Sequence, residues 1–174
     1  QLLRAAGVPQ VWPRAWSLAG KHDEAEVSAR LRRWLGKAPA LGRPRCGIAR
    51  GTNGEGEPLL VLVTVDAVAD LDRVPTRTAV SRWLSLDATM LVPASETKVV
   101  LLGPRSRPKR VLASLSGDRI RSRFNLDSPG TWLVQVVATL DDGPRPILEL
   151  NVHAGAEPPS TLEEPSDGAE ETPM

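Results

Sequence analysis

Hydrophobic and polar residues alternate along the chain from Trp83 onward, which is the pattern of β-strands with one buried face. The first of these segments alternates Leu84, Leu86 and Ala88 with polar neighbours. Five more follow, separated by turns rich in Gly, Pro and Asp, over residues 97–102, 110–115, 119–126, 131–140 and 147–153. Six short strands at this spacing predict an antiparallel β-sandwich or barrel.

The segment 131–140 is the clearest of these strands. It follows a turn over residues 127–130, and apolar side chains recur at every second position: Trp132, Val134, Val136, Ala138 and Leu140. On a pleated strand these side chains share one face, so we expect all five in the core. We therefore predict an antiparallel sandwich of immunoglobulin-like character over residues 76–155.

Before Trp83 the pattern predicts a helix over residues 23–36. Asp23 and Glu26 have the spacing of a capping box, and Gly36 is typical of a helix C-terminal stop. The apolar stripe of this helix consists of Val27, Leu31, Trp34 and Leu35. These positions share one helical face, so the helix is expected to pack on another element.

That element is expected to be a hairpin over residues 45–66, whose strands flank a Gly-rich turn. Helix and hairpin predict a small α+β lobe over residues 1–75, so the whole chain is expected to be mainly β. The first twenty residues predict a short helix and an irregular segment anchored by Trp12 and Trp16. Residues 66–75 predict a connection between the two domains, because Pro75 disfavours helix in the residue before it.

Charge divides the chain into a basic body and an acidic end. Residues 156–174 hold six Asp and Glu and no Lys or Arg, whereas residues 1–155 hold 22 basic and 15 acidic residues, a difference of +7. The acidic end is rich in Pro, Ser and Thr and has no apolar period. This composition predicts a disordered linker or tail.

A basic surface is the main candidate for function. Alternation over residues 119–126 sends Ile120 and Phe124 inward and the arginines between them outward. If this strand pairs with its neighbour, seven cations are expected on one face: Arg105, Arg107, Lys109, Arg110, Arg119, Arg121 and Arg123.

This surface has two interpretations. It either binds an acidic partner, such as an acidic glycan, a lipopolysaccharide phosphate or a protein, or it is a solvated sheet face that protects an edge from aggregation. Nucleic acid is disfavoured as the partner, because the body has one Phe and no Tyr to stack between bases.

Catalytic and metal-binding constellations are not apparent in the sequence. His22 is expected to flank the predicted helix and His153 to end the last strand, and neither lies in a nucleophile motif. Cys46 is the single cysteine, which excludes an intramolecular disulfide, and we expect it to be buried. We therefore expect no enzyme activity, no metal and no cofactor.

Three aspartates in the predicted connection form the only compact acidic cluster of the body: Asp66, Asp70 and Asp72. Their oxygens could bind calcium, although the spacing lacks the Gly and the distal Glu of an EF-hand loop. The alternative is a turn in which aspartates make local hydrogen bonds.

Seven short segments resemble the accessory region of myxobacterial-type secreted proteins that also carry a CAP domain. They are VWPRAW at 11–16, RWLG at 33–36, RCGIA at 45–49, VDAVADL at 65–71, LGPR at 102–105, PGTWLVQV at 129–136 and GPRPILE at 143–149. The resemblance covers residues 2–155 and implies a secreted or envelope setting with a further domain beyond Met174. The histidine and glutamate cluster of a CAP domain is absent from this sequence, so the resemblance implies no activity of that domain.

These observations favour a non-catalytic extracytoplasmic spacer or binding module of a larger secreted or envelope protein, contacting an acidic glycan or a protein partner. The alternative is a substrate-positioning accessory domain of a hydrolase whose catalytic domain lies outside this chain. A membrane span is not expected, because no run of eighteen apolar residues occurs.

Overall fold

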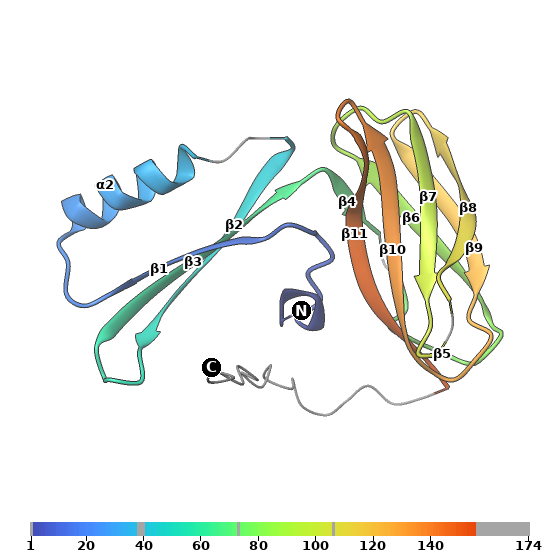
Figure 1. Ribbon diagram of the computed structural model, residues 1–174, viewed down its shortest axis with the longest axis horizontal. Coiled ribbons are helices and arrows are strands. Elements are labelled where there is room, and N and C mark those ends of the chain that lie inside the picture. Colours follow the sequence, from blue (N-terminus) through green and yellow to red (C-terminus); the bar gives the residue numbers. More distant parts are fainter. Residues whose placement is uncertain (1, 38–40, 73, 106, 156–174) are drawn as a thin grey trace, which may run out of the picture.

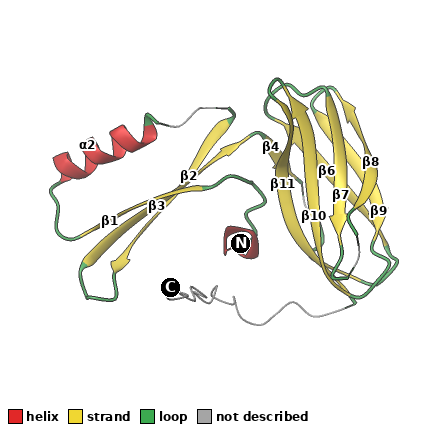
Figure 2. Ribbon diagram, viewed as in Figure 1, coloured by secondary structure: helices red, strands yellow, loops and turns green. Residues whose placement is uncertain are grey.

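The computed structural model describes residues 2–37, 41–72, 74–105 and 107–155, and within them strands predominate (Figure 1). An eight-stranded sheet curls into a sandwich beside a smaller three-stranded sheet that carries a helix (Figure 2). The predicted mainly β class with a sandwich and an α+β N-terminal part is therefore confirmed. The predicted tail at 156–174 lies outside the described residues.

The sandwich is one hydrogen-bonded sheet folded into two layers. Its strand order is β4 (Ala69–Leu71), β6 (Trp83–Met90), β9 (Arg119–Asn125), β8 (Lys109–Ser116), β7 (Glu96–Leu102), β10 (Gly130–Leu140), β11 (Gly143–Ala154) and β5 (Arg77–Thr78). All neighbours are antiparallel except β11 and β5. The first half of β8 pairs with β7 and the second half with β9, so β8 connects the two layers.

The core lies between these layers, and alternation along the strands supplies it. Trp132 is 1% exposed, and Phe124 and Leu86 are buried from the opposite layer. The predicted burial along β10 is confirmed for Trp132, Val134, Val136 and Ala138, whereas Leu140 is only half-buried. The β10 register shifts between Val136 and Val137, so both of these consecutive residues are buried.

The smaller sheet has the order β1 (Arg14–Ala19), β3 (Pro58–Ala67) and β2 (Arg43–Thr52). The predicted hairpin is confirmed as β2 and β3. The irregular segment expected near Trp12 and Trp16 is instead partly regular, because residues 14–19 form strand β1. Trp12 is 69% exposed and contacts the sandwich through its indole N–H, which donates to the Pro146 carbonyl at 3.4 Å, whereas Trp16 is half-buried opposite Leu62. β1 escaped prediction because its six residues form a strand only by pairing with β3.

Helix α2 (Glu24–Leu35) begins and ends where the sequence predicts. The Asp23 side chain accepts a hydrogen bond from the Glu26 amide at 2.7 Å, and the Gly36 amide donates to the Arg32 carbonyl. The Arg14 guanidinium of β1 lies 4.4 Å from the centre of the Trp34 ring and donates to the Trp34 carbonyl, which fixes the helix against the sheet.

Two short elements connect the smaller sheet to the sandwich. Helix α1 (Leu2–Ala5) and the segment after it meet β11: Arg4 of α1 pairs with Glu149 at 2.9 Å, and the Glu149 amide donates to the Pro9 carbonyl at 2.7 Å. β4 pairs with β6, and Ala69 is fully buried in the sandwich core. Residues 66–75 are therefore not the simple connection expected, because β4 lies within them.

Neither helix in the described part of the chain has the length and apolar character that a membrane crossing needs.

Candidate functional site

Strand β9 presents its arginines on the outer face of the sandwich, as alternation predicts. Ile120, Ser122 and Phe124 are buried, and the arginines between them point outward. The outward residues of β6 lie directly opposite: Thr89 opposite Arg119, Asp87 opposite Arg121, and Ser85 opposite Arg123.

Arg119 has a structural role. It donates to the Thr89 hydroxyl at 2.6 Å and to the Asp72 carboxylate at 2.8 Å, and so ties the residue after β4 to the sandwich. Both contacts are satisfied within the chain, so Arg119 offers little to a ligand.

Arg121 and Arg123 are more available. The Arg121 side chain is 70% exposed, and its Nε lies 3.4 Å from an Asp87 carboxylate oxygen. Arg123 is exposed and has no carboxylate partner within the described residues.

Trp83 adds an aromatic ring to this face. It is 61% exposed, and the Arg123 guanidinium lies over its ring at 5.8 Å from the centre. Its position shares the outward side of β6 with Ser85. Sequence reasoning treated Trp83 as the start of a strand and missed this exposure, although its spacing from Ser85 and Asp87 carried the signal.

Strand β8 completes the surface with small polar side chains. Ser114 lies opposite Arg121, and Ser116 lies opposite Arg119. Leu112, on the same side of β8, is 92% exposed. We name the surface formed by Trp83, Ser85, Ser114, Arg121 and Arg123 the tryptophan–arginine face.

The remaining predicted cations do not all join this face. Lys109 and Arg110 are consecutive on β8 and point to opposite sides, and Lys109 lies 3.8 Å from Asp127. Arg105 and Arg107 are exposed in the loop between β7 and β8. The expectation of seven cations on one face is therefore corrected by strand geometry.

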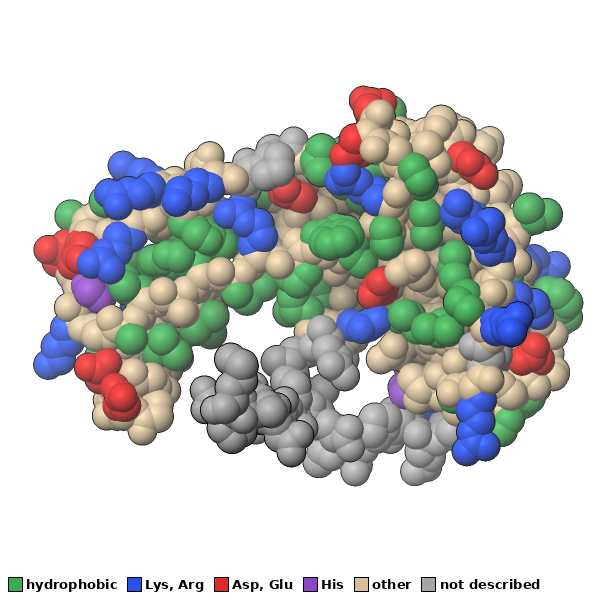
Figure 3. Space-filling model, viewed as in Figure 1, with side chains coloured by type: hydrophobic (Ala, Val, Ile, Leu, Met, Phe, Trp, Pro, Cys, Tyr) green, Lys and Arg blue, Asp and Glu red, His purple; other side chains and the backbone are tan. Residues whose placement is uncertain are grey.

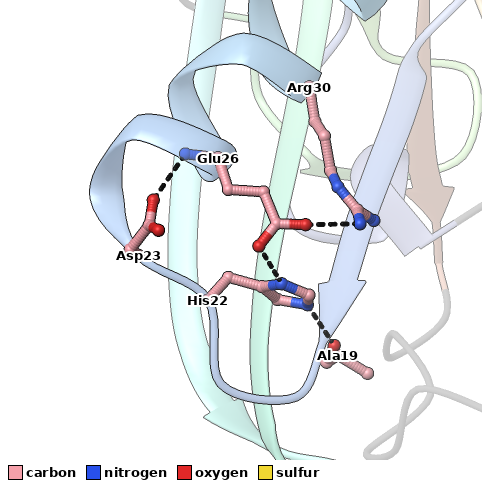
Figure 4. Close-up of polar contacts among 5 residues, drawn as sticks. All are labelled: Ala19, His22, Asp23, Glu26 and Arg30. Carbon is pink, nitrogen blue, oxygen red and sulfur yellow. Dashed lines mark hydrogen bonds and ion pairs between the residues drawn. The ribbon is translucent and has the colours of Figure 1, made fainter.

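His22 connects the strand end to the helix rather than standing free (Figure 4). Its Nδ1 lies 2.9 Å from a Glu26 carboxylate oxygen, and its Nε2 lies 2.9 Å from the Ala19 carbonyl oxygen. The hydrogen bond with Glu26 raises the pKa of His22, and the bond with Ala19 adds to the rise. Arg30 contacts the other Glu26 oxygen at 2.5 Å.

His153 lies in a different environment. It is buried at the end of β11, with its Nδ1 3.0 Å from the Thr131 hydroxyl. Burial lowers the pKa of His153, and the positive charge of Arg77 lowers it further. His22 lies between β1 and α2, whereas His153 lies within the sandwich.

The aspartate cluster is divided among ion pairs. Asp70 pairs with Arg45 and Asp72 with Arg119, while Asp66 lies in β3. The expected local turn is not observed: Asp66 and Asp70 lie in strands, and Asp72 directly follows β4. No group of three metal-ligating side chains occurs within the described residues.

Cys46 corrects another expectation. It lies on β2, all of whose residues are exposed, so the thiol is exposed and not buried. The sequence could not reveal that the thiol is exposed, because the burial of β2 depends on whether another element packs on it.

No family model matches the chain, and no curated protein matches it. The crystal structure of an engineered protein overlays on part of it with a TM-score of 0.39 and 13% sequence identity. The overlay covers 51% of this chain and 20% of that chain. That TM-score does not establish a shared fold, so the resemblance to the accessory region of CAP-domain proteins stays a prediction.

Proposed function

We propose that this chain is a non-catalytic binding module that holds an acidic polysaccharide on the tryptophan–arginine face. The observation that carries the proposal is the exposed Trp83 ring beside Arg123, with the exposed Arg121 two residues further along β9. An apolar ring and two guanidinium groups on one open surface match a ligand that has both apolar and anionic faces.

The chemistry of each group supports a sugar acid as the ligand. An indole ring offers a flat apolar surface that packs against the C–H groups of a pyranose. A guanidinium group donates two parallel hydrogen bonds to a carboxylate or sulfate, which selects a charged sugar over a neutral one. Ser85 and Ser114 supply hydroxyl groups that can donate to or accept from sugar hydroxyls.

The spacing of the arginines along one strand supports an extended chain as the ligand. Arg121 and Arg123 lie two residues apart on one strand, a separation of about 7 Å. Successive charged sugars of a polymer can therefore contact successive arginines. A single aromatic ring favours one stacked sugar and does not provide the repeated stacking that single-stranded nucleic acid needs.

The proposal includes an extracytoplasmic setting in a secreted or envelope protein. Its support is the resemblance of residues 2–155 to the accessory region of secreted CAP-domain proteins, together with the chemistry of the face. Acidic polysaccharides are components of cell envelopes, which is consistent with such a module acting as an anchor or spacer.

Isothermal titration calorimetry with polygalacturonate, a polymer of sugar carboxylates, tests the proposal. We expect the polymer to bind, neutral dextran not to bind, and the affinity to fall as salt rises, because the surface contacts are screened. Trp83→Ala and Arg123→Ser should each weaken binding about tenfold.

Matched variants on other surfaces control for general effects. Trp12→Ala removes a tryptophan that is 69% exposed, and Arg32→Ser removes an exposed charge from α2. Both should bind polygalacturonate like the unchanged protein. Equal losses in the Arg32→Ser and Arg123→Ser variants would show that only net charge matters and would contradict a specific face.

A further inference from the structure

Strand β2 is an open edge of the smaller sheet. It pairs with β3 along residues 43–52, and no described strand pairs with its other side. All ten of its residues are exposed, and Ile48 is 64% exposed. Backbone donors and acceptors alternate along such an edge and remain open to another strand.

A cleft of about 660 Å³ lies beside this edge, on the side of the sheet that carries Gly47. Its apolar lining comes from Leu3, Val8, Val63, Val65 and Leu71, and Gly47 forms part of the wall. The Arg45–Asp70 ion pair joins β2 to β4 at this cleft. The cleft is therefore suited to an apolar side chain that projects from a strand paired with β2.

The charge around β2 is positive. Residues 30–50 hold seven Lys and Arg and no Asp or Glu, and basic side chains gather over α2 (Figure 3). Arg43 and Arg50 flank the uncharged segment 46–49 on β2 and have no carboxylate partner within the described residues. An added strand with acidic side chains at both ends would complement these two arginines.

We propose that β2 binds an extended acidic segment of a partner protein by β-strand addition, with one apolar side chain of the segment in the cleft beside Gly47. Main-chain hydrogen bonds hold such a segment, and pockets for its alternate side chains select it. This surface lies on the smaller sheet, so the inference is independent of the tryptophan–arginine face.

The charges argue against a second copy of this chain as the occupant. If β2 paired antiparallel with itself around its centre, Arg45 would lie opposite the partner's Arg50, and the reverse contact would repeat at the other end. Like charges directly opposite each other destabilise a strand pair.

Gly47 allows a test that leaves the fold intact. A Cβ atom at Gly47 would meet no heavy atom within 4 Å, and the same holds for Gly51 on the same strand and face. Gly47 lines the cleft, whereas Gly51 lies outside it. Gly47→Leu therefore fills the cleft, and Gly51→Leu is a matched control.

Fluorescence anisotropy with a labelled acidic peptide of sequence EETTLTTEE, which has acidic side chains on both faces at both ends, measures the binding. We expect it to bind at least about tenfold more tightly than the basic twin KKTTLTTKK. Gly47→Leu and the double variant Arg43→Glu, Arg50→Glu should each weaken binding about tenfold, whereas Gly51→Leu should not. Hydrogen exchange of the amides at 46–49 should slow when the peptide binds.

Other outcomes would overturn the inference. They are no binding of the acidic peptide at about 1 mM, equal binding of the two peptides, or equal effects of Gly47→Leu and Gly51→Leu. A dimer in sedimentation that the Gly47→Leu variant no longer forms would show that the β2 edge binds a second copy of the chain. A rise in peptide affinity after the six carboxylates of residues 156–174 are changed to amides would show that the chain's own acidic segment competes for the β2 edge.

Discussion

At the residue scale, the two histidines lie in opposite electrostatic surroundings. Both partners of the His22 ring, the Glu26 carboxylate and the Ala19 carbonyl, accept hydrogen bonds, so only the doubly protonated imidazolium donates to both. His153 is buried near Arg77, which favours its neutral form.

These surroundings predict that the two imidazoles titrate separately. By NMR, His22 should titrate above 6.5 and His153 below it. The contribution of His22 to stability is complete below pH 6.5 and is lost as the pH rises through its raised pKa. The contribution of His153 to stability is complete above pH 6.5 and is lost as the pH falls through its lowered pKa. Glu26→Gln should lower the His22 pKa and leave His153 unchanged. Coincident titration of the two rings would contradict this account.

Two buried hydroxyl groups of the sandwich provide a second prediction. The Thr97 hydroxyl has no hydrogen-bond partner among the described residues, whereas the Ser122 hydroxyl donates to the Leu112 carbonyl at 2.8 Å. Thr97→Val should raise the free energy of unfolding by about 1 kcal/mol, and Ser122→Ala should lower it by a similar amount. Denaturant titration measures both, and changes of the same sign would show that the two sites do not differ as described.

The sequence predicted part of the candidate face at this scale. Alternation around Ile120 and Phe124 was enough to place Arg121 and Arg123 outward, because a strand has a fixed period of two. It could not show that Arg119 is held by Asp72, since that carboxylate belongs to the residue after β4, which is far away in the chain.

At the scale of elements, local signals predicted those that are long or capped. Helix α2 was marked by Asp23, Glu26 and Gly36, and the six sandwich strands were marked by alternation and turns. β1 and β4 were missed, because strands of six and three residues depend on β3 and β6 for their existence. Partners that are distant in sequence leave no local pattern.

Strand β10 offers the sharpest stability prediction among these elements. Trp132 is 1% exposed, and its indole N–H donates to the Ser128 carbonyl at 3.0 Å within the turn before the strand. Trp132→Ala should therefore lower the free energy of unfolding by about 3–5 kcal/mol. Trp12→Ala, on an exposed ring, should change it little, and a near-native melting temperature for the Trp132 variant would contradict the core assignment.

At the scale of the whole molecule, the chain combines two sheets with different open surfaces. The sandwich buries the large apolar side chains and presents the tryptophan–arginine face, while the smaller sheet leaves the β2 edge exposed. The segment before β1 and strand β4 attach the smaller sheet to the sandwich. The division of the chain at residue 75 stays a prediction, because residues before it contribute to the sandwich core.

NMR of the tryptophan indole N–H signals during titration with oligogalacturonate tests the central claim most directly. The chain has five tryptophans, and a Trp83→Phe variant assigns the signal of Trp83. We expect the Trp83 signal to shift on binding, while those of the exposed Trp12 and the buried Trp132 stay in place. A Trp83 signal that does not move at saturating oligogalacturonate, or one that moves no more than the Trp12 signal, would contradict the proposed face.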